Sequence, residues 1–179
     1  MINITFENEG NSQLELFEKE DNKLEDSKVF NKRNGRVSNL LQYQLLAEEV
    51  EDPKYAKPGD AGLDLRSAEE LIIGPGDKAL VSTGIKLAVP TKHVGLIWDR
   101  SGLAANYGIH CLAGVIDSGF RGELKIVLHN LGHEPFKIEK GMRIAQLLIQ
   151  PVVFVKLKRV KQLEETERGE SGFGSTGII

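Results

Sequence analysis

Short apolar runs separated by turn residues dominate the chain from Leu40 onward. Proline and glycine interrupt these runs, most clearly at Gly74-Pro75-Gly76-Asp77, which is a strong turn signal. The last run, over residues 152–160, alternates with the period of two that is typical of a half-buried strand. Many short strands with little helical periodicity predict an all-β barrel or sandwich. The runs that we expect to be strands are Leu41–Ala47, Leu71–Ile73, Ala79–Val81, Ile85–Val89, Val94–Trp98, Lys125–Leu128, Pro135–Ile138, Ile144–Ile149 and Val152–Val160.

One short helix interrupts the β pattern. Ser101 is a favourable N-cap residue, and Leu103-Ala104-Ala105 follow it. We therefore expect a helix from Ser101 to about Asn106, with Ser101 as its cap.

The first 38 residues differ from the rest of the chain. Acidic and basic side chains interleave there, and the few large apolar residues hold no clean period. A weak helix over residues 13–28 is the alternative to a loosely attached arm, which we favour. We divide the chain into an N-terminal arm (residues 1–38), a β domain (39–163) and a C-terminal segment (164–179).

Composition excludes several functional classes. The chain has 179 residues and a net charge of -3, so a nucleic-acid binder that relies on a basic surface is not expected. Its single cysteine, Cys111, cannot form an intramolecular disulfide or a cysteine-rich zinc site. No apolar stretch approaches the roughly 20 residues needed to span a bilayer, and the N-terminus does not resemble a signal peptide. We expect a cytoplasmic protein without a membrane partner.

The C-terminal segment has a composition suited to a nucleotide. Glycines, hydroxyl side chains and Arg168 surround one aromatic residue, Phe173. Glycine backbone N–H groups, hydroxyls and a guanidinium bind phosphate, and an aromatic ring stacks on a base. We expect a flap that closes over a nucleotide; the alternative is a Gly/Ser tail without a ligand.

A carboxylate stands in the turn Gly114–Glu123. An apolar strand end leads to Asp117 in a Ser-Gly turn, with Phe120 beside it, and the chain returns from Glu123. The pattern predicts a hairpin that holds Asp117 near its tip, where it could act as a general base. The alternative is that Asp117 only caps the turn.

Three further segments carry polar groups suited to anion binding. Asp99–Ala104 places Arg100, Ser101 and Gly102 at a helix N-terminus, which favours an anion. Gly141–Gln146 carries a polar glutamine among apolar residues, and Ala61–Arg66 carries an aspartate between leucines. Each also has an ordinary structural interpretation, such as a surface arginine or a paired buried carboxylate.

Taken together and in this order, the five segments resemble the five motifs of the homotrimeric dUTP pyrophosphatases (dUTPases). The resemblance covers about Leu40 to Gly177. It implies a jelly-roll-like β-barrel (β-clip) with one short helix and a flexible C-terminal flap. It also implies a homotrimer with active sites shared between subunits. The implied activity is Mg²⁺-dependent hydrolysis of dUTP to dUMP and pyrophosphate, which limits uracil in DNA and supplies dUMP for dTMP synthesis.

The resemblance also assigns roles to residues. Asp117 is similar to the catalytic aspartate that activates the water attacking the α-phosphorus. Residues 109–116 resemble the hairpin whose backbone reads the uracil edge. Phe120 stands where the family usually has a tyrosine beneath the deoxyribose. No direct metal ligand is implied, because the triphosphate chiefly holds Mg²⁺ and Asp64 lies near its water shell. The implied substrate contacts are Arg100, Ser101, Gly102, Gly114, Phe120, Arg143, Gln146, Arg168, Phe173, Gly174, Ser175 and Thr176.

Two alternatives remain. A dCTP deaminase shares this fold and the Asp-x-Gly-Phe turn, but Val127 stands where we align its catalytic glutamate, and Glu123 is too early to replace it. A regulatory or interaction protein on the same scaffold is the other alternative, favoured only by the N-terminal arm.

Overall fold

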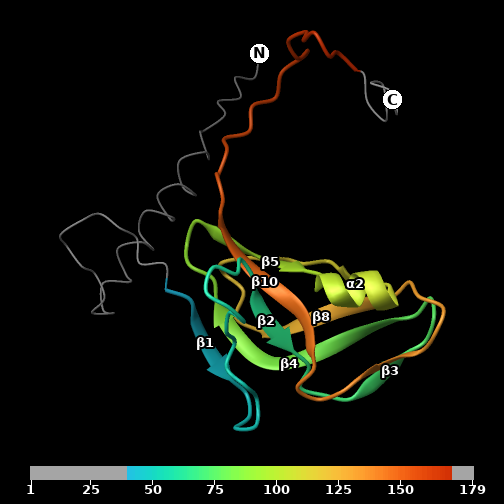
Figure 1. Cartoon of the computed structure of the whole chain (residues 1–179). Coiled ribbons are helices and arrows are strands. Elements are labelled where there is room, and N and C mark those ends of the chain that lie inside the picture. The colour runs from blue at the N-terminus through green and yellow to red at the C-terminus, as the bar shows by residue number, and fades with distance from the viewer. Residues whose placement is uncertain (1–39, 171–179) are drawn as a thin grey trace, which may run out of the picture.

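The computed structural model describes residues 40–170, so the arm predicted for residues 1–38 and most of the predicted flap lie outside the described residues. Two four-stranded antiparallel sheets make up most of the described fold (Figure 1). The first sheet has the order β1-β4-β8-β6 and consists of β1 (Gln42–Leu45), β4 (Lys78–Ala88), β8 (Glu123–Asn130) and β6 (Ile109–Leu112). The second has the order β2-β10-β5-β7 and consists of β2 (Leu63–Arg66), β10 (Arg143–Pro151), β5 (His93–Trp98) and β7 (Val115–Ile116).

A two-stranded sheet and a helix complete the described elements: β3 (Leu71–Ile73) pairs with β9 (Phe136–Ile138), and α2 (Ser101–Tyr107) follows β5. The predicted all-β class with one short helix is confirmed. Among the described strands, however, the pairings form open sheets rather than one closed barrel.

The runs Ala79–Val81 and Ile85–Val89 form a single strand, β4, rather than two. The register of β4 against β8 shifts between Ser82 and Lys86. Gly84 lies within this bulge with a φ of 67°, a backbone conformation that glycine adopts without steric cost. The residues between the two apolar runs therefore form a bulge within one strand, and not a turn between two strands.

The hairpins expected over residues 109–116 and 114–123 are both wrong in their pairing. Strand β6 pairs with β8 in the first sheet, whereas β7 pairs with β5 in the second. The chain crosses between the sheets at Ala113 (φ 61°) and Gly114 (φ 146°). A Cβ atom on Gly114 would lie 2.9 Å from the carbonyl oxygen of Ile97, so glycine is required at this crossing. Residues 113–114 are called the β6–β7 crossing below.

The strand predicted over residues 152–160 is also wrong. The Val152 N–H donates to the Lys92 carbonyl oxygen at 2.9 Å, and the chain then runs away from the sheets without a strand pairing (Figure 1). Val153 and Leu157 are 87% and 95% exposed. The alternation in the sequence is real, but within the described chain no strand lies beside it to form a ladder.

The helix cap lies one residue earlier in the chain than we expected. Arg100 is the N-cap residue, with extended backbone, and it makes no side-chain capping bond; Ser101 is the first helical residue. The Arg100 carbonyl accepts from the N–H groups of Leu103 and Ala104 at 2.9 and 3.0 Å. At the C-terminus of α2, Gly108 caps the helix in the left-handed conformation, as is common for helices.

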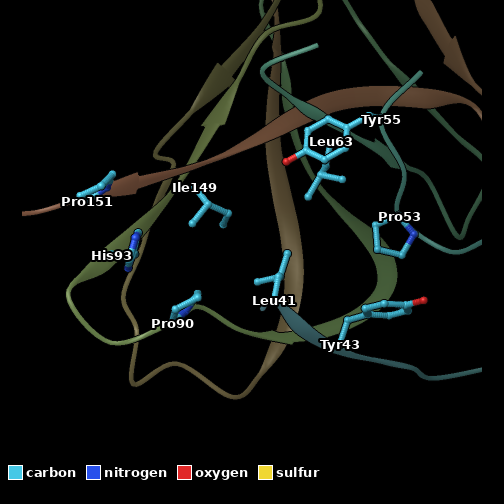
Figure 2. Close-up of a pocket in the computed structure, with 9 residues that line it drawn as sticks. All are labelled: Leu41, Tyr43, Pro53, Tyr55, Leu63, Pro90, His93, Ile149 and Pro151. Carbon is cyan, nitrogen blue, oxygen red and sulfur yellow. The ribbon is translucent and has the colours of Figure 1, made fainter. Parts of the chain in front are cut away.

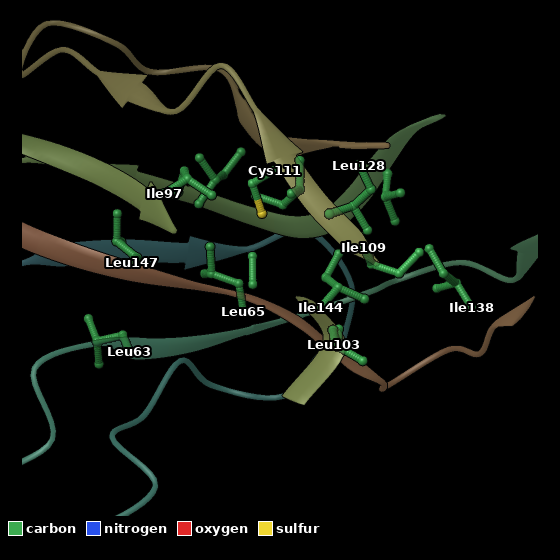
Figure 3. Close-up of a cluster of buried hydrophobic side chains, with 14 of the residues drawn as sticks. Leu63, Leu65, Ile97, Leu103, Ile109, Cys111, Leu128, Ile138, Ile144 and Leu147 are labelled. Carbon is green, nitrogen blue, oxygen red and sulfur yellow. The ribbon is translucent and has the colours of Figure 1, made fainter. Parts of the chain in front are cut away.

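Side chains from both sheets meet in one hydrophobic core (Figure 3). Leu65 and Leu147 come from the second sheet, and Ile126 and Leu128 from the first; all are at most 2% exposed. Leu103 anchors α2 to the same core. Because tightly packed cores deform little, the ends of β2, β5 and β10 are held in fixed positions, and these ends carry the polar cluster described next.

Candidate functional site

An ion-pair cluster on the second sheet joins three of the five sequence segments. Asp64 lies on β2, and its side chain is 14% exposed. Its Oδ1 accepts from Nε of Arg100 at 3.1 Å, and its Oδ2 faces a terminal nitrogen of Arg143 at 3.3 Å. Arginine is well suited to planar recognition of phosphate and carboxylate oxygens. Two guanidinium groups around one carboxylate leave a net positive charge here, which suits an anionic ligand.

Gln146 lies beside this cluster. In the ladder it stands opposite Asp64 on one side and Trp98 on the other. Its Nε2 donates to the carbonyl oxygen of Asp99 at 2.7 Å. Gly62 permits this packing, because a Cβ atom there would lie 2.9 Å from Cβ of Gln146. The structure thus brings together Asp64, Arg100, Arg143 and Gln146, which the sequence placed in separate motifs.

Asp99 joins the cluster to strand β6. Its Oδ1 accepts from the Cys111 N–H at 2.6 Å, and its Oδ2 lies 2.8 Å from Nδ1 of His110. Burial acts to raise the pKa of Asp99, but the bonds from His110 and Cys111 outweigh it and hold that pKa below its ordinary value of 3.8. Asp99 therefore stays ionised at neutral pH and fixes the end of β5 against β6.

A cavity of about 470 Å³ lies between the end of β5 and the β6–β7 crossing. Trp98, Asp99, His110 and Gly114 are among the residues that line it. The cavity has the size of a small-ligand site, and it adjoins the segment that carries Arg100.

Cys111 also lines this cavity, but it is not a candidate nucleophile. Burial, followed by the neighbouring Asp99 carboxylate, raises the pKa of the Cys111 thiol to about 12. Because the thiolate is the reactive form, the thiol is unreactive at neutral pH.

Asp117 and Phe120 lie on an exposed turn. The Phe120 N–H donates to the Asp117 carbonyl oxygen at 3.1 Å, and the Arg121 guanidinium donates to the carbonyls of Ser118 and Phe120, both at 2.7 Å. In the described chain the turn is closed by the backbone and Arg121, not by the Asp117 carboxylate. The Phe120 ring covers Gly122, where a Cβ would lie 2.7 Å from Cζ of the ring.

The turn and the cluster remain separate within one chain. Among residues 40–170, no hydrogen bond or ion pair joins Asp117 to Asp64, Arg100 or Arg143. Ser101 and Gly102 are exposed on the first turn of α2. Arg168 falls in the described chain, whereas Phe173, Gly174, Ser175 and Thr176 lie outside it.

A second hollow of about 380 Å³ opens where the C-terminal segment leaves the sheets (Figure 2). Leu41, Tyr43, Tyr55, Ile149 and Pro151 are among the mainly apolar residues around it. Within the described chain its lining contains no predicted site residue. Its composition suits an apolar side chain rather than a charged nucleotide.

Comparison with known proteins agrees with this geometry. The dUTPase family model matches residues 48–177. The chain belongs to the dUTPase family. It is 53% identical over 129 residues to the deoxyuridine 5'-triphosphate nucleotidohydrolase of Clostridium kluyveri. The aligned region covers 71% of this chain and 90% of the relative. It is 46% identical over 152 residues to that of Alkaliphilus metalliredigens, covering 84% and 99% respectively.

Solved structures of phage dUTPases are similar as well. The dUTPase of Staphylococcus bacteriophage 80alpha, determined with dUPNHPP, has a TM-score of 0.71 and 33% identity, covering 79% of this chain and 100% of that one. It is described in connection with control of virulence-gene transfer by a G protein-like mechanism. A mutant dUTPase from phage phi11 of S. aureus, described with a structural Mg(II) ion, has a TM-score of 0.66 and 29% identity, covering 69% and 98%.

Sequence reasoning missed two structural partners of this site. It quoted Asp99 in a motif without giving it a role, and it gave His110 no partner. A carboxylate directly after a buried strand, and directly before an arginine at a helix start, was the signal that could have identified Asp99. Its partners lie 11 and 12 residues further along the chain, on a strand of the other sheet, and only the fold shows that approach.

Proposed function

We propose that this protein hydrolyses dUTP to dUMP and pyrophosphate. The observation that carries the proposal is the cluster in which Asp64 orients Arg100 and Arg143 beside Gln146, in a chain of the dUTPase family. The cluster supplies cationic groups for a triphosphate, and the adjoining cavity accommodates the base. By removing dUTP, the reaction limits uracil in DNA and supplies dUMP for dTMP synthesis.

The residues divide the chemical work. Arg100 and Arg143 bind phosphate oxygens and stabilise charge that develops on the leaving pyrophosphate. Asp117 accepts the proton of the water that attacks the α-phosphorus, a role that its exposed carboxylate permits. Phe120 lies beneath the deoxyribose and leaves no room for a 2′-hydroxyl. Gln146, Ser101 and Gly102 complete the phosphate contacts, and Gly114 contributes backbone to the base site.

The C-terminal flap completes the site when substrate is bound. Arg168, Ser175 and Thr176 bind the γ-phosphate, Phe173 stacks on the uracil, and Gly174 lets the backbone approach. Closure of such a segment excludes water and aligns the reacting groups.

Mg²⁺ is the cofactor that we propose. In the described chain no cluster of three or more His, Cys, Asp or Glu side chains could hold a metal ion. Both oxygens of Asp64 already face guanidinium groups. These residues fit a cation carried by the triphosphate and reached through water, which agrees with the tendency of Mg²⁺ to keep its waters. When bound, the ion neutralises charge on the phosphates.

We further propose that the active enzyme is a homotrimer with shared sites. Two observations support assembly. The Asp117 turn and the arginine cluster do not meet within one chain, so a second copy is needed to combine them. In addition, apolar side chains of the segment after Pro151, such as Val153, Phe154 and Leu157, are 71–95% exposed, which is costly unless a partner covers them.

Pyrophosphate release from dUTP, dTTP, dCTP and UTP, measured in parallel with Mg²⁺ and with EDTA, tests the proposed reaction. We expect metal-dependent release from dUTP, with UTP rejected because Phe120 occupies the space of the 2′-hydroxyl. Absence of release from all four nucleotides by folded protein would contradict the proposal.

Deamination of dCTP is disfavoured by the surroundings of β8. Val127, at the position aligned with the deaminase glutamate, pairs with Leu80 and Leu112 and offers no proton-transfer group. The Glu123 carboxylate is bound by the Ser82 hydroxyl and by the Gly84 N–H at 3.0 Å. Release of ammonia from dCTP would overturn this argument.

A second candidate function is nucleotide-controlled binding of a partner. It is favoured by the description of the phage 80alpha dUTPase, a structural relative, as acting in control of virulence-gene transfer. A pull-down with the full chain and with a chain lacking residues 1–38, each with and without a non-hydrolysable dUTP analogue, tests it. Capture that depends on both the analogue and the arm supports this function.

A further inference from the structure

Strand β6 lies at the edge of the first sheet, beside β8 alone in the order β1-β4-β8-β6. The N–H groups on the free side of an edge strand need partners from elsewhere. The Cys111 N–H finds its partner in Asp99, whose Oδ1 accepts it at 2.6 Å. A side chain from the end of β5 in the second sheet therefore closes the edge of the first sheet.

Asp99 makes two more contacts. Its Oδ2 lies 2.8 Å from Nδ1 of His110, and its carbonyl oxygen accepts from Nε2 of Gln146 at 2.7 Å. The side chain of Asp99 is 24% exposed, and that of His110 is 50% exposed. Because hydrogen bonds to an ionised acceptor are stronger than neutral ones, Asp99 binds β6 more firmly than a neutral side chain would.

The position of this junction matters for the site. Asp99 directly precedes Arg100 of the proposed phosphate-binding cluster, and only Leu112 separates Cys111 from the β6–β7 crossing. The cavity proposed for the base lies between them and includes Asp99, His110 and Gly114 in its lining. The separation between the phosphate and base subsites is thus set at Asp99.

We propose that Asp99 is a positioning residue that gives the enzyme its selectivity for the base. It holds the backbone of the β6–β7 crossing at a fixed distance from Arg100. Only a nucleotide whose base edge matches that backbone then places its α-phosphorus correctly. A site built to hydrogen-bond one base edge discriminates well only when its donors and acceptors are held rigidly. This inference rests on the proposed dUTP hydrolysis and adds the origin of its selectivity.

Steady-state hydrolysis of dUTP, dCTP and dTTP by Asp99→Ala and Asp99→Asn tests the proposal. For Asp99→Ala we expect kcat/KM for dUTP to fall about 10- to 100-fold, mainly through KM, because a hydrogen bond to a charged acceptor is lost. The ratio of kcat/KM for dUTP to that for dCTP should fall at least about fivefold, because the crossing can then adjust to other bases. Asp99→Asn should recover most of that ratio, since its amide oxygen still accepts from Cys111.

A merely structural role predicts a different result. In that case all three nucleotides lose activity by one common factor and the selectivity ratio stays at the wild-type value, which would overturn the inference. If Asp99→Ala does not fold, Asp99→Glu takes its place, because it keeps the charge but displaces the carboxylate from Cys111; the same loss of ratio is expected, and an unchanged ratio again overturns the inference.

Two comparisons complete the design. Glu139→Ala removes a carboxylate that pairs with Lys137 at 2.9 Å on the exposed surface, and it should leave the rates and the ratio unchanged. Wild-type protein that fails to hydrolyse dUTP counts against the proposed function itself. Wild-type protein that hydrolyses dUTP, combined with an unchanged ratio in Asp99→Ala and Asp99→Glu, counts against the positioning role alone.

Discussion

Asp117 presents an exposed carboxylate on a turn whose closure depends on the backbone and on Arg121. Asp117→Asn keeps the shape of the side chain and removes its basicity. Because a positioned general base contributes about 10²–10⁴-fold to a rate, we expect kcat to fall by that factor while binding of a non-hydrolysable dUTP analogue is retained. Pyrophosphate release and calorimetric titration measure the two quantities.

The control for this change is Asp52→Asn, an exposed aspartate that accepts a hydrogen bond from the Tyr43 hydroxyl at 2.9 Å. It should leave kcat unaltered. Substantial residual turnover in Asp117→Asn would contradict the assignment of the base.

Asp99 also makes the free energy of unfolding depend on pH in the acidic range. Its pKa in the folded chain lies below the ordinary 3.8, so its contribution to the free energy of unfolding is fully present above pH 3.8 and is lost as the pH falls through the folded value. Urea unfolding should show wild type more stable than Asp99→Asn by about 1 kcal/mol at pH 7. We expect this difference to shrink below pH 3.8.

Other carboxylates with lowered pKa values, such as Glu123, are common to both proteins and cancel in the difference. A difference that stays constant from pH 7 to pH 3 would show that the charge of Asp99 does not stabilise the fold.

Between elements, the close approach of β2 and β10 depends on Gly62. A Cβ atom there would lie 2.9 Å from Cβ of Gln146, so Gly62→Ala must displace the side chain that donates to Asp99. Overpacking of this kind costs about 1–3 kcal/mol, and we expect that loss in urea unfolding together with a lower kcat/KM for dUTP. Gly119→Ala, whose added Cβ meets nothing within 4 Å, is the matched control and should change stability by less than about 0.5 kcal/mol.

The strands themselves could be predicted from the sequence, but their partners could not. Leu71–Ile73 is a strand with the expected bounds, because a short apolar run and a following Gly-Pro turn are local signals. The hairpins expected over residues 109–116 and 114–123 were wrong, because the backbone at Ala113 and Gly114 leads the chain to the other sheet. Pairing depends on contacts distant in sequence, which local patterns do not encode.

The candidate site, too, could be predicted from the sequence only in its residues and not in their contacts. The residue types and order of the five motifs singled out Asp64, Arg100, Arg143 and Gln146, and in the structure these four lie together. Their roles toward a substrate stay predictions. The role of Asp99 was not predicted, because its partners lie on a strand of another sheet. The chemistry of single residues is therefore visible in the sequence, while the contacts that orient them are visible only in the fold.

On the scale of the whole molecule, the chain after Pro151 divides into two parts with different expected tasks. Residues 153–163 carry exposed apolar side chains, with Leu157 at 95% and Leu163 at 81%, and these suit contact with another copy. The segment from Arg168 onward carries the groups that suit a phosphate and a base. Assembly and catalysis should therefore be separable by truncation at two points.

A chain ending at Glu167 should keep its assembly and lose catalysis. It retains the exposed apolar part and removes Arg168 with every other predicted flap residue, so we expect kcat/KM for dUTP to fall at least about 100-fold, because closure and alignment are lost. A chain ending at Pro151 removes both parts and should also shift the molecular mass toward that of a monomer. Light scattering on a sizing column and pyrophosphate release measure the two effects.

If the chain ending at Glu167 also lost its assembly, the terminal residues would be structural rather than catalytic. If it kept full activity, the flap would have no part in hydrolysis, and the phosphate contacts of Arg100 and Arg143 would have to suffice.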